Sequence, residues 1–327
     1  MNKQRWNQAN GVLKRAFTSK ISLYAILLVF FVWPLVHANT YHRHVAIIML
    51  LGAICGLAYN IFFGYMGQVN FGPVAWYGIG AYGAAITEQT LGVPWLLAVF
   101  IMGPVTAGVI GWLLSFPILR LRGHGMALGT FAFAFMVYLI LEKWTSLTGG
   151  GDGMLVDAPH LFGFNLRMGT GLYYLTLVCA IICFILCHWV ISSKHGRAIK
   201  AIRTDEVGAA AMGINVMRYK RSIYVLSCVM FGLGGGLLSQ EVGRLGPDYA
   251  SISGNFLIIL MLVTGGRRSN VGMVVGGFLI GLLPVLLADF VEYAVVIYSV
   301  ILITILRFMP DGIIGEVRRW LGLRVTR

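Results

Sequence analysis

Long apolar segments restrict the fold of this chain more than any other feature. There are ten candidates, and many of them approach or exceed the about 20 residues that cross a bilayer as a helix. They are 21–38, 45–63, 70–87, 95–117, 125–141, 172–191, 222–240, 254–266, 271–288 and 293–308. Hydrophobic residues make up 58% of the chain and charged residues only 11%. The segments do not alternate apolar and polar residues as barrel strands do. We therefore predict an all-α polytopic membrane protein of about ten transmembrane helices, with a range of eight to ten.

The charges predict how these segments are oriented. If the basic N-terminus is cytoplasmic, alternation places all but four of the 25 Lys and Arg residues in the cytoplasm, and eight of the 12 acids outside. Cytoplasmic loops carry this excess of basic residues. We predict a basic cytoplasmic N-terminal segment 1–20, a transmembrane domain 21–308 and a basic cytoplasmic tail 309–327. The transmembrane domain would hold an external loop 142–171 and a cytoplasmic loop 193–221.

Two of the ten segments leave alternatives open. Segment 254–266 is short and could be re-entrant or tilted instead of a full crossing. Segment 21–38 ends in Val36-His37-Ala38, which resembles a signal cleavage site. The basic region before it is long for a signal peptide, so we expect the first span to be retained.

Motifs for catalysis, metal binding and ATP binding are missing from the sequence. There is no Gly-x-Ser-x-Gly, His-Glu-x-x-His or phosphate-loop motif, so ATP would have to be bound by another chain. Cys179, Cys183 and Cys187 share a helical face next to His188, but small thiols packed in a membrane helix are the commoner outcome. We expect no metal site. The basic residues that give the net charge of +13 lie mostly in the predicted cytoplasmic segments next to the membrane. This placement indicates contact with membrane lipid and not with nucleic acid.

Uncharged polar residues are the main candidates for a solute path. The span interiors hold almost no ionisable residues, which disfavours a proton-coupled carrier and leaves a sodium-coupled carrier open. A lining of amides and hydroxyls suits a small solute, although each residue could instead bond between helices. These residues are Asn60, Gln68, Asn70, Thr87, Thr130, Ser227 and Thr264. The glycines and Pro73 of GQVNFGPVAWYGIGAYGAA (67–85) fit either tight helix packing or a broken helix that lines a cavity.

The cytoplasmic loop 193–221 has the signals of a short surface helix. Thr204 is a good N-cap, and Asp205 and Glu206 then place negative charge where the helix dipole favours it. Gly213 suits the residue after the helix, and Asn215 can cap the helix that enters the next span. We predict a helix over about residues 205–212, which is too short to be stable alone.

Two interpretations of this loop follow from its residues. It could be a solvated loop whose basic residues contact anionic lipid, or its helix could dock in a groove of a cytoplasmic partner. In either case we expect Arg218, Lys220 and Arg221 to anchor at the lipid surface.

Four stretches together resemble the branched-chain amino acid ABC transporter permeases, LivM-like subgroup. They are GYMGQVNFGPVAWYGIGAYGAA (64–85), LRLRGHGMALGTFAFA with WTSLTGGGDGM (119–134 and 144–154), GRAIKAIRTDEVGAAAMGINVMRYKRSIYVLSCVMFGLGGGLLS (196–239) and LMLVTGGRRSNVGMVVGGFLIGLLP (260–284). They occur in the family's order and cover most of residues 45–310.

The resemblance implies a multi-pass permease subunit of an ABC importer in the bacterial inner (cytoplasmic) membrane. Its partners would be a homologous permease in a heterodimer, two cytoplasmic ATP-binding subunits and a periplasmic solute-binding protein. ATP and Mg would be held by those partners, so that this chain would carry no cofactor and would not be an enzyme itself. The solute would be a branched-chain amino acid or one of the other solutes that relatives in this family carry, which include urea, short amides and aromatic acids.

The resemblance also assigns roles to residues. The helix near 205–212 would be the coupling helix. Its contact with the ATPase would involve Arg203, Asp205, Glu206, Ala209, Met212 and Gly213. The solute path would include Gln68, Asn70, Pro73 and Thr130. The alternative is a stand-alone secondary carrier or channel for a small neutral or zwitterionic solute.

Overall fold

The computed structural model describes residues 40–309 without 122, 162–163, 168–169, 288–289 and 291–292, and also residues 312 and 316. The predicted segments 1–20 and 21–38, including the alternative signal cleavage site, lie outside the described residues. So does nearly all of the tail 309–327.

Five helices of the described chain are long and apolar enough to cross a membrane. The first, Thr40–Tyr65, consists of α3 (Thr40–Tyr59) and the π-helical η1 (Asn60–Tyr65). The second, Trp95–Ile118, consists of α5 (Trp95–Leu97), the π-helical η2 (Ala98–Met102) and α6 (Gly103–Ile118). The others are α7 (His124–Lys143), α9 (Gly171–Ser192) and α12 (Val216–Glu241). They match five predicted spans, so the all-α polytopic class is confirmed, while the number ten stays a prediction.

Helix α4 (Pro73–Leu91) lies inside the bundle, packed against α12, α6 and α7. Its glycines allow this close packing. A Cβ on Gly80 would collide with the backbone of Gly232, and one on Gly235 of α12 would collide with the backbone of Tyr77. The structure therefore gives the glycine-rich segment a packing role along α4.

The remaining predicted spans are short helices. They are α13 (Ile252–Gly265), α14 (Asn270–Gly281) with α15 (Leu283–Leu286), and α16 (Ala294–Phe308). Helix α14 runs antiparallel to α3, with Gly277 against Gly52 and Met273 against Gly56. Helix α13 has 14 residues, about 21 Å of helix, which is less than the hydrocarbon thickness.

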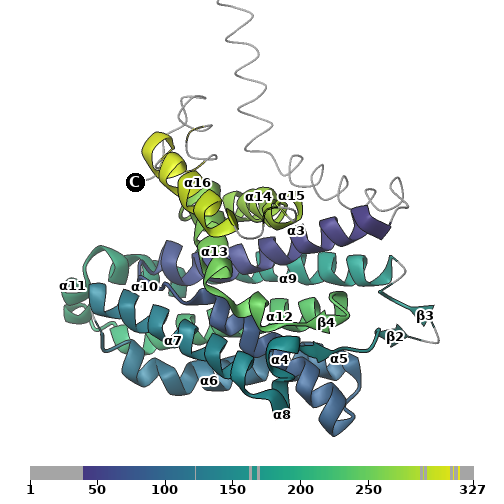
Figure 1. Cartoon of the computed structure of the whole chain (residues 1–327). Helices are drawn as coiled ribbons and strands as arrows, with labels where there is room; N and C mark the ends of the chain where they lie inside the picture. The colour runs from purple at the N-terminus through teal and green to yellow at the C-terminus, as the bar shows by residue number, and fades with distance from the viewer. Residues whose placement is uncertain are drawn as a thin grey trace, which may run out of the picture.

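Short elements mark the two ends of the bundle (Figure 1). One end, which we call the α11 end, carries α10 (Lys194–Thr204) and α11 (Glu206–Ala211). The opposite end, the β4 end, carries α8 (Thr145–Thr148), η3 (Gly150–Asp152), β1 (Met154–Leu155), β2 (His160–Leu161), β3 (Phe164–Asn165), β4 (Arg244–Leu245) and η4 (Pro247–Ala250).

The predicted external loop 142–171 is held to the bundle at the β4 end. Strand β1 pairs antiparallel with β4, with Met154 opposite Leu245. Arg167 donates from Nε to the Gln240 carbonyl at 2.6 Å and from Nη2 to the Asp157 carbonyl at 2.9 Å. This segment is thus fixed to the end of α12 and to β4 by strand pairing and by the side chain of Arg167.

Candidate functional site

The predicted short helix at the α11 end is confirmed, and its boundary lies one residue later than expected. Asp205, not Thr204, is the N-cap: its Oδ1 accepts from Val207 N at 3.0 Å. Thr204 stays inside α10, because Asp205 N still bonds to the Ala201 carbonyl. Gly213 follows the helix with φ +81, a backbone conformation that suits glycine.

Helix α11 presents one face to solvent and one to its own chain. Val207 and Met212 are 80% and 84% exposed. Ala209 is 5% exposed and belongs to the hydrophobic core, so it cannot also form part of a docking face. Of the six residues predicted for partner contact, Asp205, Met212 and Gly213 are exposed.

Glu206 turns toward the bundle and makes two polar contacts with one oxygen. Its Oε1 accepts from Nε2 of Gln68 at 3.0 Å and lies 2.5 Å from Nζ of Lys220. Lys220 is 7% exposed, so the expected lipid anchor is wrong for this residue. Its neighbour Arg221 stacks its guanidinium over Phe116, 4.0 Å from the ring centroid, while Arg218 is exposed.

Arg203 also points into the bundle. Its Nη1 donates to the Gly64 carbonyl in η1. Burial, followed by the nearby charges of Arg268 and Arg267, lowers the pKa of Arg203 to about 10. Arg203 therefore connects α10 to η1, and Glu206 connects α11 to Gln68 just after η1. Among the described residues, none covers the exposed side of α11.

The chain between η1 and α4, residues 66–72, is non-helical, and we call it the interior break. It reaches into the bundle: the Asn70 carbonyl accepts from Tyr59 Oη at 2.6 Å, and Phe71 N donates to Oγ1 of Thr130 at 2.9 Å. Thr130 lies more than one and a half turns into α7, about 9 Å from its first residue. Helix α4 accordingly begins at Pro73 inside the bundle, with proline at the position that needs no N–H donor.

Helix α13 begins beside the start of α4. Asn255 in its first turn is 3% exposed and accepts from Val74 N through Oδ1 at 3.1 Å. Ser251 and Ser253 lie there too, with their hydroxyl oxygens 2.7 Å apart. These three residues are not among those predicted from the sequence for the solute path. The signal was present, because polar residues cluster where the short segment 254–266 begins, and short interrupted segments are typical of transporter sites.

The starts of α4 and α13 meet at this junction, so the positive ends of two helix dipoles lie near each other. Of the four residues predicted for the solute path, Asn70, Pro73 and Thr130 gather here. Gln68 points to Glu206 instead. The side chains of Asn70 and Thr130 form hydrogen bonds with backbone groups of the interior break and of α7. The direct role of these two residues is therefore to stabilise the conformation of the interior break.

The cysteine row on α9 is part of the packing. Cys179, Cys183 and Cys187 are buried, and Cys187 Sγ lies 3.9 Å from Met230 Sδ. His188 instead faces a cavity at the α11 end. The cysteines thus fill space between α9, α3 and α12.

Comparisons with known proteins cover nearly the whole chain. The family model described as "Branched-chain amino acid transport system / permease component" matches residues 42–306. The chain is 25% identical to the high-affinity branched-chain amino acid transport system permease protein LivM of Salmonella typhimurium, across 93% of this chain and 77% of that protein. It is 26% identical to LivM of Escherichia coli, with the same coverage. It is 28% identical to the permease protein LivH of Escherichia coli, across 81% of this chain and 91% of that protein. No solved structure matches the chain.

Proposed function

The chain belongs to the branched-chain amino acid transport permease family, and we propose that it is the LivM-type permease subunit of an ABC importer. It would form half of the translocation path and be driven by separate ATP-binding subunits. Two LivM proteins match over 93% of this chain. LivH proteins also match, which supports pairing with a homologous permease in a heterodimer.

The contacts of α11 support the coupling role more than any other observation. The helix exposes Val207 and Met212, while Glu206 reaches back to Gln68 in the interior break. A partner that moves α11 would therefore pull on the segment that ends at the junction of α4 and α13. The exposed apolar side chains would fit a groove on an ATP-binding subunit, and the α11 end would then face the cytoplasm.

The junction of α4 and α13 is the place we propose for solute passage. A branched-chain amino acid carries a carboxylate, which helix N-termini attract, and an apolar side chain, which the surrounding bundle tolerates. Phe71, 40% exposed, supplies an aromatic surface at the interior break. Delivery by a periplasmic solute-binding protein to the β4 end, and location in the bacterial inner membrane, complete the proposal.

Reconstitution tests this function and separates it from the alternative of a stand-alone carrier or channel. Proteoliposomes would contain this chain with its partner permease and ATP-binding subunits, and solute-binding protein would be added outside. We expect uptake of labelled leucine only when ATP and all subunits are present. Uptake by this chain alone, without ATP, would contradict the proposal. Parallel assays with urea, a short amide and an aromatic acid decide the solute.

A further inference from the structure

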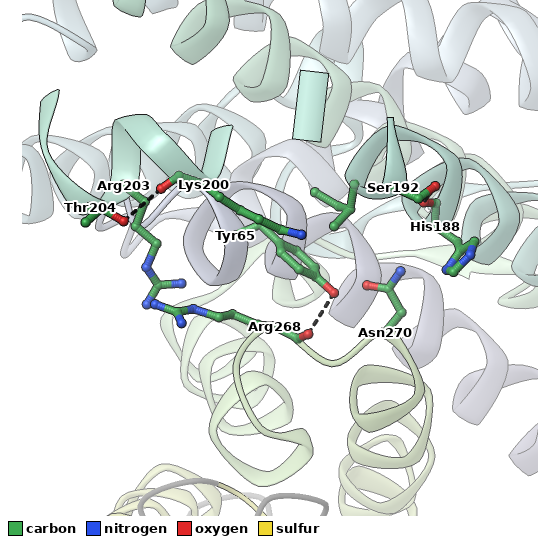
Figure 2. A pocket seen from close by; sticks show the side chains of 9 residues that line it. Tyr65, His188, Ser192, Lys200, Arg203, Thr204, Arg268 and Asn270 are labelled. Atoms are coloured by element: carbon green, nitrogen blue, oxygen red, sulfur yellow. Dashed lines mark hydrogen bonds between the residues drawn. The ribbon is translucent and has the colours of Figure 1, made fainter. Parts of the chain in front are cut away.

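A basic cavity lies at the α11 end, apart from the exposed face of α11. It has a volume of about 590 Å³ and lies between the ends of α9, α10 and η1 and the turn that joins α13 to α14. Lys200, Arg203, Arg268 and His188 contribute to its lining, and Tyr65 and Asn270 add polar groups (Figure 2). None of the nine residues that the structure places around the cavity is acidic.

The cations of this cavity are not neutralised within the described part of the chain. None of the three ion pairs found there involves Lys200, Arg203 or Arg268. Figure 2 shows the guanidinium groups of Arg203 and Arg268 turned toward one another. Their repulsion contributes to the lowered pKa of Arg203. Like charges held this close favour a bound anion.

The cavity is built from fixed groups. The backbone of Arg268 is held on both sides, since its N–H donates to Asn60 Oδ1 at 3.2 Å and its carbonyl accepts from Tyr65 Oη at 2.7 Å. Arg268 has φ +68, the only positive φ of a non-glycine residue among those described. Such a strained backbone persists where the surrounding contacts fix it, and it is frequent at ligand sites. Arg203 is held through the Gly64 carbonyl.

An apolar stripe leads from the cavity along the outside of α9. Val178, Ile182, Ile185 and Trp189 are exposed at helical spacing, and they end beside His188 and Ser192 of the cavity. A tryptophan at the end of such a stripe is typical of the level of lipid headgroups. A ligand that fits both features has an acyl tail and an anionic head.

We propose that this cavity binds the phosphate of an anionic phospholipid headgroup from the leaflet at the α11 end. Guanidinium and ammonium groups are the usual partners of phosphate. The acyl chains would lie on the α9 stripe. Because the turn 266–269 and Arg203 share the site, the bound headgroup would hold α13, α14 and α10 together. This site is separate from the solute path, and transport of any solute is not needed to test it.

Native mass spectrometry of the full chain in a neutral detergent tests the proposal. The probes are phosphatidylglycerol, phosphatidylcholine with the same acyl chains, and inorganic phosphate as a competitor. We expect one phosphatidylglycerol to bind in preference to phosphatidylcholine. Arg268→Gln and Lys200→Gln should each weaken that binding about fivefold. Arg197→Gln, which removes an exposed cation of α10 outside the cavity, is the matched control and should leave binding unchanged.

The competitor arm identifies the source of the phosphate. Retention of phosphatidylglycerol in the presence of millimolar inorganic phosphate assigns the site to lipid. If inorganic phosphate displaces phosphatidylglycerol, and Arg268→Gln and Lys200→Gln both weaken phosphate binding, the cavity is a phosphate site but the lipid origin of the phosphate is overturned. Equal binding by the unmodified chain and both variants overturns the proposal. Lys200 is exposed, so its variant remains informative if Arg268→Gln impairs folding.

Discussion

Gln68 donates a hydrogen bond from Nε2 to Oε1 of Glu206 at 3.0 Å, which ties the interior break to the short helix α11. The two residues are 138 positions apart. One follows the π-helical end of the first described span, and the other begins the helix that exposes Val207 and Met212. Movement of α11 thus has a direct physical route to the start of α4.

Removing the charge of Glu206 should loosen this connection. Glu206→Gln deprives Lys220 of its ion pair, and the Lys220 side chain is only 9% exposed. We expect the free energy of unfolding to fall by about 1–2 kcal/mol, less than for a fully buried pair because Glu206 is 43% exposed. Thermal unfolding of the purified chain measures this. Adding Lys220→Met should recover stability, and Asp205→Asn, which keeps the cap, serves as control.

Charge on the exposed face of α11 should block assembly without unfolding the chain. We expect Met212→Glu to abolish co-purification of the ATP-binding subunits at an unchanged melting temperature, because Met212 is 84% exposed. Leu155→Glu makes the same change at the β4 end, where the side chain is 63% exposed, and should leave assembly intact. Normal ATP-driven uptake by Met212→Glu would contradict the docking role. Ala209→Glu, by contrast, should destabilise the chain itself, because it buries a charge.

The hydroxyl of Thr130 should be needed to hold the interior break. Thr130→Val keeps the shape but leaves Phe71 N without its acceptor, which costs about 1–3 kcal/mol. We expect reduced stability and slower solute uptake. Thr130→Ser keeps the hydroxyl and should retain most of both. Equal uptake by the Val and Ser variants would show that the hydrogen bond is dispensable for transport.

The contact between α4 and α12 should not tolerate a methyl group. Gly80→Ala places a Cβ against the backbone of Gly232, so the helices must separate, at a cost of about 1–3 kcal/mol. Gly125→Ala in α7 meets nothing within 4 Å and should be neutral or slightly stabilising. The melting temperatures of the two variants are measured, because Gly80 is in close contact with a neighbouring helix and Gly125 is not. A melting temperature of Gly80→Ala equal to that of the unmodified chain would show that the contact between α4 and α12 tolerates a methyl group.

Local signals in the sequence determined the helical membrane class, five of the spans, and the short helix with its glycine stop at Gly213. Apolar length, charge placement and capping act over a few residues, so they can be recognised without knowing what packs against them. The family followed from the order of several such stretches.

Only the tertiary structure decided which faces are buried and which distant residues meet. The sequence grouped Ala209 with Met212, yet packing of α11 on its own bundle buries the first and exposes the second. The sequence predicts that Lys220 is a surface cation, but the carboxylate of Glu206 on α11 lies 2.5 Å from its amine. Asn255 acquires a partner in Val74 only because two helices start at the same depth. These contacts join residues of different helices, so the partners depend on how the helices pack, even where polar residues mark the position in the sequence.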